Sequence, residues 1–480
     1  LTMVLWHNNG KAQIDKDANF TLSIVADKYY IIDKNGDTLK KLSDLRRIEQ
    51  FDYRGFAKVT KEAENYLVDT LGNAYRVAYN IEDLTPDIVA LDLSFQNLEA
   101  LPEIVCEQRQ LKVLLLVYNL FTALPESLGN LVNLQRLDIE KTLLRTLPES
   151  LGNLTNLQVL NLADSDLRAL PQSIGNLTNL QTLDLSNETF NSINNNKLDS
   201  LPESIGNLTN LQVLNLRKNG LKVLPESIGK LINLKKLDLE DNQLSSLPES
   251  ICNISTLQTL DLYRNHLTSL PTDIGKLTKL QTLIVGINRL TSLPESISNL
   301  TNLQRLGLWT NDLRVLPKNI GNLTNLQWLV LTGNQFSHLP KSFTNLTELE
   351  TLGLSGNKLR TLPKNLGNLT KLQELYLNFN QLRTLPKSLG NLTSLQTLSL
   401  SGNQLNTLFE SIIKLTNLQT LSLSDNQLQT LPKNITKLTN LQTLALEGNP
   451  QLSPYNKQLI GEELKTFLAK LSKGEIKFGK

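Results

Sequence analysis

The chain has few of the residues on which catalytic and metal sites usually depend. Its 480 residues include only three histidines (His7, His266 and His338) and two cysteines (Cys106 and Cys252). No G-x-x-x-x-G-K-[ST] phosphate loop and no H-E-x-x-H zinc motif occurs. His266 and His338 fall outside the strand segments described below, which leaves a Ser-His-Asp or Cys-His arrangement without a plausible geometry. The sequence therefore predicts that the protein is not an enzyme and carries no metal or cofactor.

Charge of one sign and long hydrophobic runs are scarce as well. The 48 lysines and arginines nearly balance 46 acids, and no five basic residues cluster together. Non-specific nucleic-acid binding therefore has no electrostatic basis. The longest apolar run, Val113 to Val117, is strand-sized, so no segment is long enough to span a membrane. Because the first residue is Leu1, we expect a processed or truncated product. A cytoplasmic location is favoured, with a secreted or cell-surface location as the alternative.

What the chain does contain is an internal repeat with the unit L-x-x-L-x-L-x-x-N-x-L-x-x-L-P-x-x-I-G-N-L-x-x. Fourteen of the fifteen intervals between repeat starts are 23 residues long, and one is 31. The sixteen starts are Ile88, Leu111, Leu134, Leu157, Leu180, Leu211, Leu234, Leu257, Leu280, Leu303, Leu326, Leu349, Leu372, Leu395, Leu418 and Leu441. Such an array escapes the usual limit on domain size, because each unit buries its apolar side only against its neighbours.

Each position of the repeat has a physical reason. Leucines alternate with polar residues in segments such as Leu398-Ser399-Leu400, which predicts a strand with one buried face. Proline after the last leucine fixes the chain as it leaves the turn, and the glycine of I-G-N favours a chain reversal. The two cysteines share one repeat position six repeats apart, roughly 29 Å at the spacing of stacked strands. They are too distant for a disulfide and are predicted to be small buried residues.

An asparagine column follows the strands. Its amides can bond backbone groups of the repeats above and below. Near the amino end the column is replaced by Gln96, Thr142 and Ser165, so we expect those turns to be held less well. The column comprises Asn196, Asn219, Asn242, Asn265, Asn288, Asn311, Asn334, Asn357, Asn380, Asn403, Asn426 and Asn449.

This pattern resembles the leucine-rich-repeat family, in its 23-residue L-P-x-x-I-x-x-L variety known from bacterial proteins and Ras-associated adaptors. The resemblance implies a curved α/β solenoid of about sixteen repeats over residues 83–452, or a strand-and-coil solenoid if the convex segments are irregular. It also implies a parallel sheet on the concave face and protein or peptide partners bound there. We expect a monomer.

The two ends differ from the array. In residues 1–82, Tyr30 to Gly36 recurs as Tyr66 to Gly72, and Asn-Gly and Gly-Asn turns indicate β-hairpins. This region resembles the bacterial WG β-repeat, although the Trp-Gly pair is missing; we expect it to cap the first repeat, with an independent binding module as the alternative. In residues 453–480, apolar residues at helical spacing predict a capping helix from about Asn456 to Leu471, followed by a frayed tail.

The columns that the consensus leaves free should carry the function, because residues flanking the strand leucines point to the concave surface. The residue between the two strand leucines changes from Asp and Asn to apolar residues and glycine at about the ninth repeat. Near that point, Gly286, Gly307 and Gly353 leave space on the concave surface. Exposed aromatic residues clustered on a surface are typical of binding hot spots. The predicted partner-binding residues are Asp238, Asp261, Tyr263, Arg264, Ile284, Ile287, Trp309, Trp328, Val330, Tyr376 and Phe379.

Other interpretations remain open at this point. The Asp/Asn column could be a calcium site, but a straight column does not bring six to eight oxygens to one point. A solvated polar ladder or a surface for a basic ligand is the preferred interpretation. The same aromatic residues would suit cell-surface adhesion or glycan binding. The chain could also be the sensor arm of a larger signalling protein, such as a GTPase, or part of an effector enzyme.

Two further asymmetries are visible. An Asn- and Ser-rich insertion within Asn187 to Asn195 should protrude beside the concave face, as a tolerated surface loop or as a loop that grips a ligand. The residue after the L-P pair changes from glutamate to lysine along the chain, which indicates either two ancestral blocks or a surface that orients a dipolar partner. That column comprises Glu103, Glu126, Glu149, Glu203, Glu226, Glu249 and Glu295, then Lys318, Lys341, Lys364, Lys387 and Lys433.

Overall fold

The structure is a computed structural model. It describes residues 20–25, 28–33, 38–42, 47–48, 52, 54–61, 64–187, 195–432, 434–453 and 455–476. Four predictions therefore lie outside the described residues, namely those on His7, the Asn35-Gly36 turn, most of the insertion after Asn187, and Lys433. So does the end of the carboxy-terminal tail.

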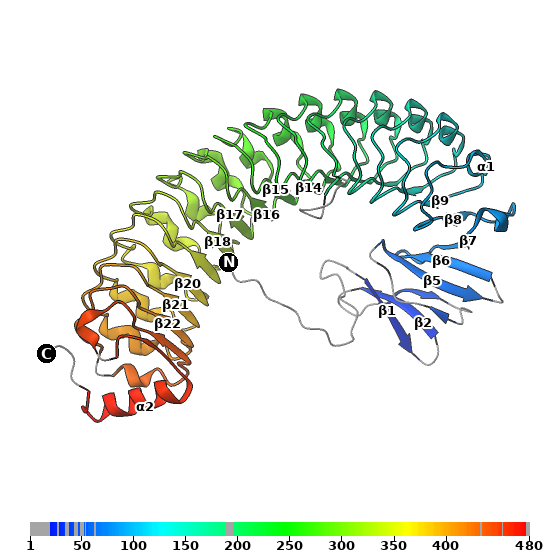
Figure 1. Ribbon diagram of the computed structural model, residues 1–480. Helices are drawn as coiled ribbons and strands as arrows, with labels where there is room; N and C mark the ends of the chain where they lie inside the picture. The colour runs from blue at the N-terminus through cyan, green and yellow to red at the C-terminus, as the bar shows by residue number, and fades with distance from the viewer. Residues whose placement is uncertain are drawn as a thin grey trace.

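The repeats form a solenoid with a parallel sheet along its concave side, as the sequence predicts. One three-residue strand per repeat pairs in register with the next, and the whole array bends into an arc (Figure 1). The strands are β8 (Ala90–Asp92), β9 (Val113–Leu115), β10 (Arg136–Asp138), β11 (Val159–Asn161), β12 (Thr182–Asp184), β13 (Val213–Asn215), β14 (Lys236–Asp238), β15 (Thr259–Asp261), β16 (Thr282–Ile284), β17 (Arg305–Gly307), β18 (Trp328–Val330), β19 (Thr351–Gly353), β20 (Glu374–Tyr376), β21 (Thr397–Ser399), β22 (Thr420–Ser422) and β23 (Thr443–Ala445).

The core is one continuous column of leucines inside this arc. Leu306 and Leu308, which flank an outward-pointing residue of β17, are completely buried, and their equivalents in neighbouring repeats are too. Each fully buried leucine side chain stabilises the fold by roughly 2 kcal/mol. Cys106 and Cys252 are free and buried in the same column, as predicted.

The asparagine column holds successive repeats together at the turn after each strand. Asn311 donates to the carbonyl oxygens of Val285 (2.9 Å) and Leu308 (3.2 Å), and its own oxygen accepts from the Leu290 amide at 2.9 Å. One side chain thus satisfies backbone groups in its own and the preceding repeat, which confirms the expected role of this column. Asn119, which the column alignment did not include, makes the same set of bonds.

At two of the three substituted positions, Thr142 and Ser165, hydroxyl groups replace the amide. Thr142 and Ser165 lie 3.1 Å apart, and both hydroxyls reach the carbonyl oxygen of Ile139. A hydroxyl has a single hydrogen to donate, whereas the asparagine amide donates two. These turns therefore hold their neighbours through fewer bonds than an asparagine supplies.

The convex side is built from short 3-10 helices, because the L-P-x-x-I-G-N segment is too short for α-helices. Within the described part of the array, only the first repeat has a one-turn α-helix, α1 (Glu103–Cys106). The others are η2 (Glu126–Asn130), η3 (Glu149–Asn153), η4 (Gln172–Asn176), η5 (Glu203–Asn207), η6 (Glu226–Lys230), η7 (Glu249–Asn253), η8 (Ile274–Lys276), η9 (Glu295–Asn299), η10 (Ile320–Asn322), η11 (Lys341–Asn345), η12 (Leu366–Asn368), η13 (Lys387–Asn391), η14 (Glu410–Lys414) and η15 (Ile435–Lys437).

The glycine of I-G-N has a different role from the predicted chain reversal. Its backbone is not in the left-handed region; instead, the next repeat approaches it closely. A Cβ atom on Gly321 would lie 2.0 Å from the backbone oxygen of Ser342 in the next repeat. Glycine is therefore required by contact between repeats rather than by a turn.

This contact is correlated with the length of the next 3-10 helix. The residue that the glycine approaches in the next repeat, such as Ser342 opposite Gly321, is serine in most repeats. Where it is serine, the 3-10 helix of that next repeat has five residues, and the residue opposite the serine is glycine in every repeat after the first. Where aspartate or asparagine replaces this serine, the 3-10 helix of the next repeat has three residues, and the glycine position opposite it holds a residue with a side chain. The four large-residue pairs are Cys252 with Asp273, Ser298 with Asn319, Thr344 with Asn365, and Ile413 with Asn434.

The amino-terminal strands continue the concave sheet. β4 (Arg47–Ile48), β5 (Phe56–Lys61), β6 (Glu64–Asp69) and β7 (Ala74–Ala78) pair antiparallel in order, and β7 pairs in parallel with β8. The hairpin expected at the Gly72-Asn73 turn is confirmed. A separate antiparallel sheet contains β1 (Phe20–Val25), β2 (Lys28–Asp33) and β3 (Thr38–Leu42).

The carboxy-terminal end is closed by a strand and a helix. β24 (Gln458–Ile460) pairs antiparallel with β23, and α2 (Gly461–Ser472) packs beside it with Leu464 and Phe467 buried. The prediction of a helix from Asn456 was wrong at its start, because residues 458–460 cover the unpaired backbone of the last strand. Ile460, assigned to the apolar helix face, is 55% exposed. No helix among the described residues is both long and apolar enough to cross a membrane.

A column of left-handed residues borders the concave strands. It follows the strand by three residues, and four repeats place glycine there, at Gly333, Gly356, Gly402 and Gly448. Ile287 (φ 51°) and Thr310 (φ 52°) are β-branched residues at the same position. The Cβ atom of such residues crowds the backbone in this region, at a cost of about 1–2 kcal/mol.

We expect replacement of Thr310 by glycine to raise the free energy of unfolding by about 1 kcal/mol, because the exposed Thr310 side chain offers little packing to lose. Urea denaturation measures this change. Thr310→Ala keeps the Cβ atom and should give no comparable gain; an equal gain from alanine would show that left-handed strain is not the cause.

We expect Gly321→Thr to destabilise the solenoid by about 1–3 kcal/mol, because its side chain meets the backbone of Ser342. Adding Ser342→Asn reproduces the native Thr344–Asn365 pair and should restore about half of the loss. A double-mutant cycle in urea measures the coupling. Strictly additive effects would contradict the proposed link between side-chain size and helix length.

Candidate partner-binding surface

Three aromatic residues pack together in the middle of the concave face. Tyr263 follows β15, Trp309 follows β17, and Trp328 begins β18. The rings of Tyr263 and Trp309 lie 5.4 Å apart between centroids, and those of Trp309 and Trp328 meet edge to face at 6.1 Å. All three side chains are half-buried. We call these residues the aromatic cluster.

Glycines form the floor beneath this cluster. A Cβ atom on Gly286 would lie 2.3 Å from the Trp309 ring, and one on Gly307 would lie 2.4 Å from it. The space that the sequence predicted beside these glycines is therefore occupied by the indole of Trp309. The space at Gly353 is less closely filled, because a Cβ atom there would lie 3.1 Å from Thr332 and 3.2 Å from Val330. A large ring can lie flat on the sheet here only because the neighbouring repeats lack side chains.

The remaining predicted aromatic residues lie farther along the sheet. Phe379 lies across Gly402 of the next repeat and is 66% exposed. Tyr376 is paired with Glu374, and burial together with that carboxylate raises the pKa of the tyrosine. Among the described residues, no ring contact joins either one to the aromatic cluster.

The predicted residues beside the aromatic cluster have varied surroundings. The side chain of Ile284 lies close to Gly307, next to the Trp309 ring. Arg264 and Ile287 occupy the left-handed column at the edge of the sheet, where Arg264 lies 3.5 Å from Asp241. Ile287 is joined to the aromatic cluster through its backbone amide, which donates to the Trp309 carbonyl at 2.8 Å, whereas Arg264 is engaged at the rim.

Sequence reasoning missed one residue of this surface. The guanidinium of Arg305 lies over the Trp328 ring, 4.6 Å from its centroid. Stacking of this kind fixes the indole and adds about 0.5–1 kcal/mol at an exposed position. The signal was present, because Arg305 occupies in β17 the position that Trp328 occupies in β18.

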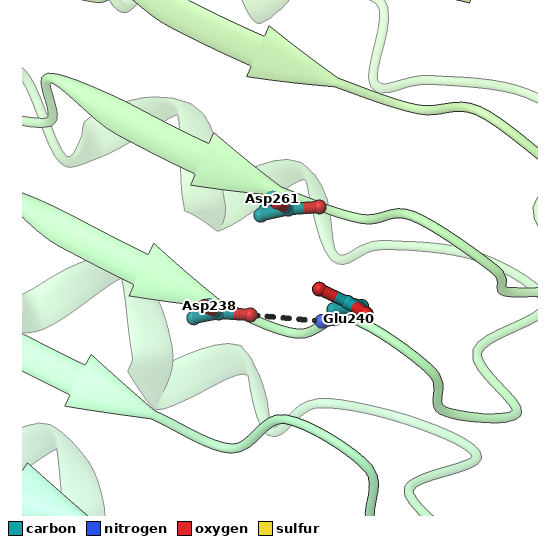
Figure 2. Close-up of side chains that lie close together, drawn as sticks. All are labelled: Asp238, Glu240 and Asp261. Atoms are coloured by element: carbon teal, nitrogen blue, oxygen red, sulfur yellow. Dashed lines mark hydrogen bonds between the residues drawn. The ribbon is translucent and has the colours of Figure 1, made fainter. Parts of the chain in front are cut away.

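Three carboxylates converge next to the aromatic cluster. Asp238 and Asp261 are directly opposite each other on β14 and β15, and Glu240 turns back between them (Figure 2). Each offers an oxygen atom, and the three oxygens lie within 4.8 Å of one another. The backbone amide of Tyr263 donates to Asp261 at 2.9 Å, which ties the two clusters together. We call these residues the acidic cluster.

Burial and the neighbouring carboxylates disfavour the charged forms of Asp261 and Glu240. Burial raises the pKa of Asp261 to about 6, and the neighbouring Asp238 and Glu240 add to the increase. Burial also raises the pKa of Glu240, although Arg217, at 2.8 Å, acts in the opposite direction. Asp238 is only 9% exposed. The interpretation of this column as a fully solvated ladder was therefore wrong, because neighbouring strands crowd the side chains.

The acidic cluster also changes the argument about metals. The sequence suggested a straight column without convergence, but Glu240 brings a third oxygen toward the two aspartates. Carboxylate oxygens suit hard cations such as calcium. Three ligand atoms are about half of the six to eight that calcium takes, so the described carboxylates form an incomplete calcium site.

A second aromatic contact lies near the amino end. Phe95 and Tyr118 stack with centroids 4.8 Å apart in the left-handed column, and Lys141 lies 5.1 Å from the Tyr118 ring. Phe95 is 64% exposed. The signal was present in the sequence, because Phe95 and Tyr118 are one repeat length of 23 residues apart, in the same column as Ile287 and Phe379.

Comparisons with known proteins agree with the repeat. Models described as leucine-rich repeat region, leucine rich repeats (two copies) and leucine rich repeat match residues 88–193, 226–315 and 305–380, residues 370–414 and 416–458, and residues 192–244, respectively. Comparison with curated protein sequences gives no match.

Solved structures show the same architecture. A leucine-rich-repeat protein from Leptospira interrogans is 40% identical, with a TM-score of 0.72 over 82% of this chain and 97% of that one. The plant peptide hormone receptor RGFR1 in complex with RGF2 is 32% identical, with a TM-score of 0.66 over 79% of this chain and 62% of the receptor. An internalin from Listeria monocytogenes, 24% identical with a TM-score of 0.52 over 73% of this chain and 89% of that one, shares the fold.

Members of this family generally serve as binding scaffolds rather than as enzymes. The matched family models cover most of the chain, and the match to the Leptospira protein covers nearly the full length of that protein. The chain belongs to the leucine-rich-repeat family.

Proposed function

We propose that this protein is a non-catalytic receptor for a protein or peptide, which it binds on the concave face at the aromatic cluster. The observation that carries this proposal is the packing of Trp309 on Gly286 and Gly307 between Tyr263 and Trp328. Half-buried aromatic residues held in one orientation provide a large contact area at little entropic cost, and such residues dominate binding energy in protein interfaces.

The neighbouring strain and charge support the same location. Ile287 and Thr310 hold unfavourable left-handed backbones beside Trp309, and the acidic cluster concentrates repelling carboxylates. Backbone strain is concentrated at functional sites in proteins generally, because selection for binding tolerates a local loss of stability. Among the described residues, Ile287 and Thr310 are the two β-branched residues of the left-handed column, whose other members are glycine or residues unbranched at Cβ.

The solved relatives fit a peptide partner. RGFR1 was solved with RGF2, and it shares the solenoid over 79% of this chain. An extended peptide can run along a concave sheet and present alternate side chains to successive repeats. Glycan binding, the alternative use of exposed aromatic rings, is separated from peptide binding by parallel peptide and glycan arrays.

We expect Trp309→Ala combined with Trp328→Ala to weaken partner binding by roughly a hundredfold or more, because the two indoles form the centre of the surface. Affinity capture followed by surface plasmon resonance with the captured partner measures the loss. The melting temperature should change little, since both side chains lie on the surface of the sheet. Unchanged affinity would overturn the proposed location.

Gly286→Ala tests the same surface without removing an aromatic residue. Its Cβ atom would displace the Trp309 ring, so we expect binding to fall by roughly tenfold or more. Gly220→Ala is a matched control, because its Cβ atom would approach neighbouring atoms no closer than 3.4 Å. Equal effects of the two substitutions would show that glycine flexibility, rather than the position of Trp309, matters.

The unliganded protein should become less stable as pH rises through the pKa of Asp261. That pKa is raised to about 6, above the roughly 3.9 of an unfolded aspartate, so the folded state binds the proton more tightly. Its contribution to stability is complete below about pH 4 and lost by about pH 7. Asp261→Asn should therefore stabilise the protein at pH 7 by on the order of 2 kcal/mol relative to pH 4. Urea denaturation at both pH values measures this, with Asp312→Asn as the control; equal responses of the two variants would contradict it.

A further inference from the structure

We propose that the acidic cluster and the adjoining aromatic rings bind an arginine side chain of the partner peptide. This inference rests on the proposed function and names the chemistry that the concave face selects. The occupant is an extended peptide segment in which an arginine reaches Asp238 and Asp261, while neighbouring apolar side chains contact Trp309. Charge complementarity on the concave surface supports this choice.

The protein already contains such an arrangement on the same face. In β10, the guanidinium of Arg136 donates to both oxygens of Asp138, at 3.1 Å from Nε and 2.9 Å from Nη2. The ring of Phe56, from β5, lies against the same guanidinium at 4.7 Å. Asp138 occupies the strand position that Asp238 and Asp261 occupy four and five repeats later. A carboxylate of this column together with an aromatic ring is thus a binding site for a guanidinium within the molecule itself.

The acidic cluster has the components of that arrangement, but among the described residues its one arginine, Arg217, is paired with Glu240 rather than with the two aspartates. Among the described residues, no ion pair reaches Asp238 or Asp261. The nearby Arg217 is paired with Glu240, and Arg264 lies beside Asp241. Tyr263, whose ring belongs to the aromatic cluster, is linked to Asp261 through its backbone amide, which donates to that carboxylate. The carboxylates therefore face the concave surface with unbalanced negative charge next to an aromatic surface.

Arginine suits this surface better than lysine does. Its planar guanidinium donates in parallel to two carboxylates and stacks on a ring at the same time. In this molecule Arg136 donates to both oxygens of Asp138 while it lies against Phe56, and the guanidinium of Arg305 lies over the Trp328 ring. A lysine would satisfy the charge as a point cation but would leave one carboxylate and the flat ring without a matching partner.

A library of random dodecapeptides displayed on phage tests the inference with the full-length chain. Selection on the wild-type protein should enrich peptides with an arginine next to an aromatic or aliphatic residue. The best peptide is then synthesised with arginine and with citrulline, which has the same shape but no charge. Fluorescence anisotropy should show roughly tenfold or greater loss of affinity on replacing arginine with citrulline.

Two variants assign that loss to the acidic cluster. Asp238→Asn combined with Asp261→Asn should weaken the arginine peptide by roughly tenfold and leave the citrulline peptide nearly unchanged. Asp312→Asn, an exposed charge away from the concave strands, should change neither affinity. Because the paired Asp→Asn change relieves repulsion without changing shape, it should leave the fold intact, which circular dichroism verifies.

The outcomes separate this inference from the proposed function. Peptides that depend on Trp309 but show no preference for arginine would overturn the inference and leave the proposed function standing. An arginine preference that survives in the Asp238→Asn and Asp261→Asn double variant would also overturn it. If no selected peptide depends on Trp309, the proposed function fails, and the inference fails with it.

Discussion

The contact between successive repeats is the constraint on which the rest of the structure depends. Neighbouring strands must lie about 4.8 Å apart for their backbone hydrogen bonds to form, and every other position adapts to that distance. Asn311 bridges two repeats with a single amide, and Gly321 lacks a side chain because the next backbone lies where a Cβ atom would be. A repeat has no core of its own, so the leucines become a core only when the repeats stack.

At the two ends of the array, the outermost strand has no further repeat to pair with, so another segment of the chain pairs with it. The first repeat receives β7 along its strand, and the last receives β24 in the antiparallel direction. Both additions satisfy backbone groups that would otherwise remain an open sheet edge. At the amino end, the added strands also cover part of the concave face, where Phe56 and Arg136 enclose Asp138.

The concave positions are the ones that stacking leaves free, and there the repeats diverge. Trp309 occupies space that two glycines provide, and Ile287 and Thr310 occupy backbone positions better suited to glycine. The acidic cluster places repelling carboxylates beside these residues. None of these features is required for the repeats to stack. In the proposed function, the aromatic cluster contributes apolar contacts to the partner and the acidic cluster contributes negative charge.

The sequence by itself determined the repeat, the concave sheet, the leucine core and the asparagine column, because each depends on the order of residues within one unit. It also located Tyr263, Trp309 and Trp328 on the same face. It could not reveal that Gly321 is required by Ser342, that Glu240 turns back toward Asp238 and Asp261, or that Phe95 stacks on Tyr118. Those relations depend on distances between different repeats, which are set by the curvature and close stacking of the whole array. Only the tertiary structure decided them.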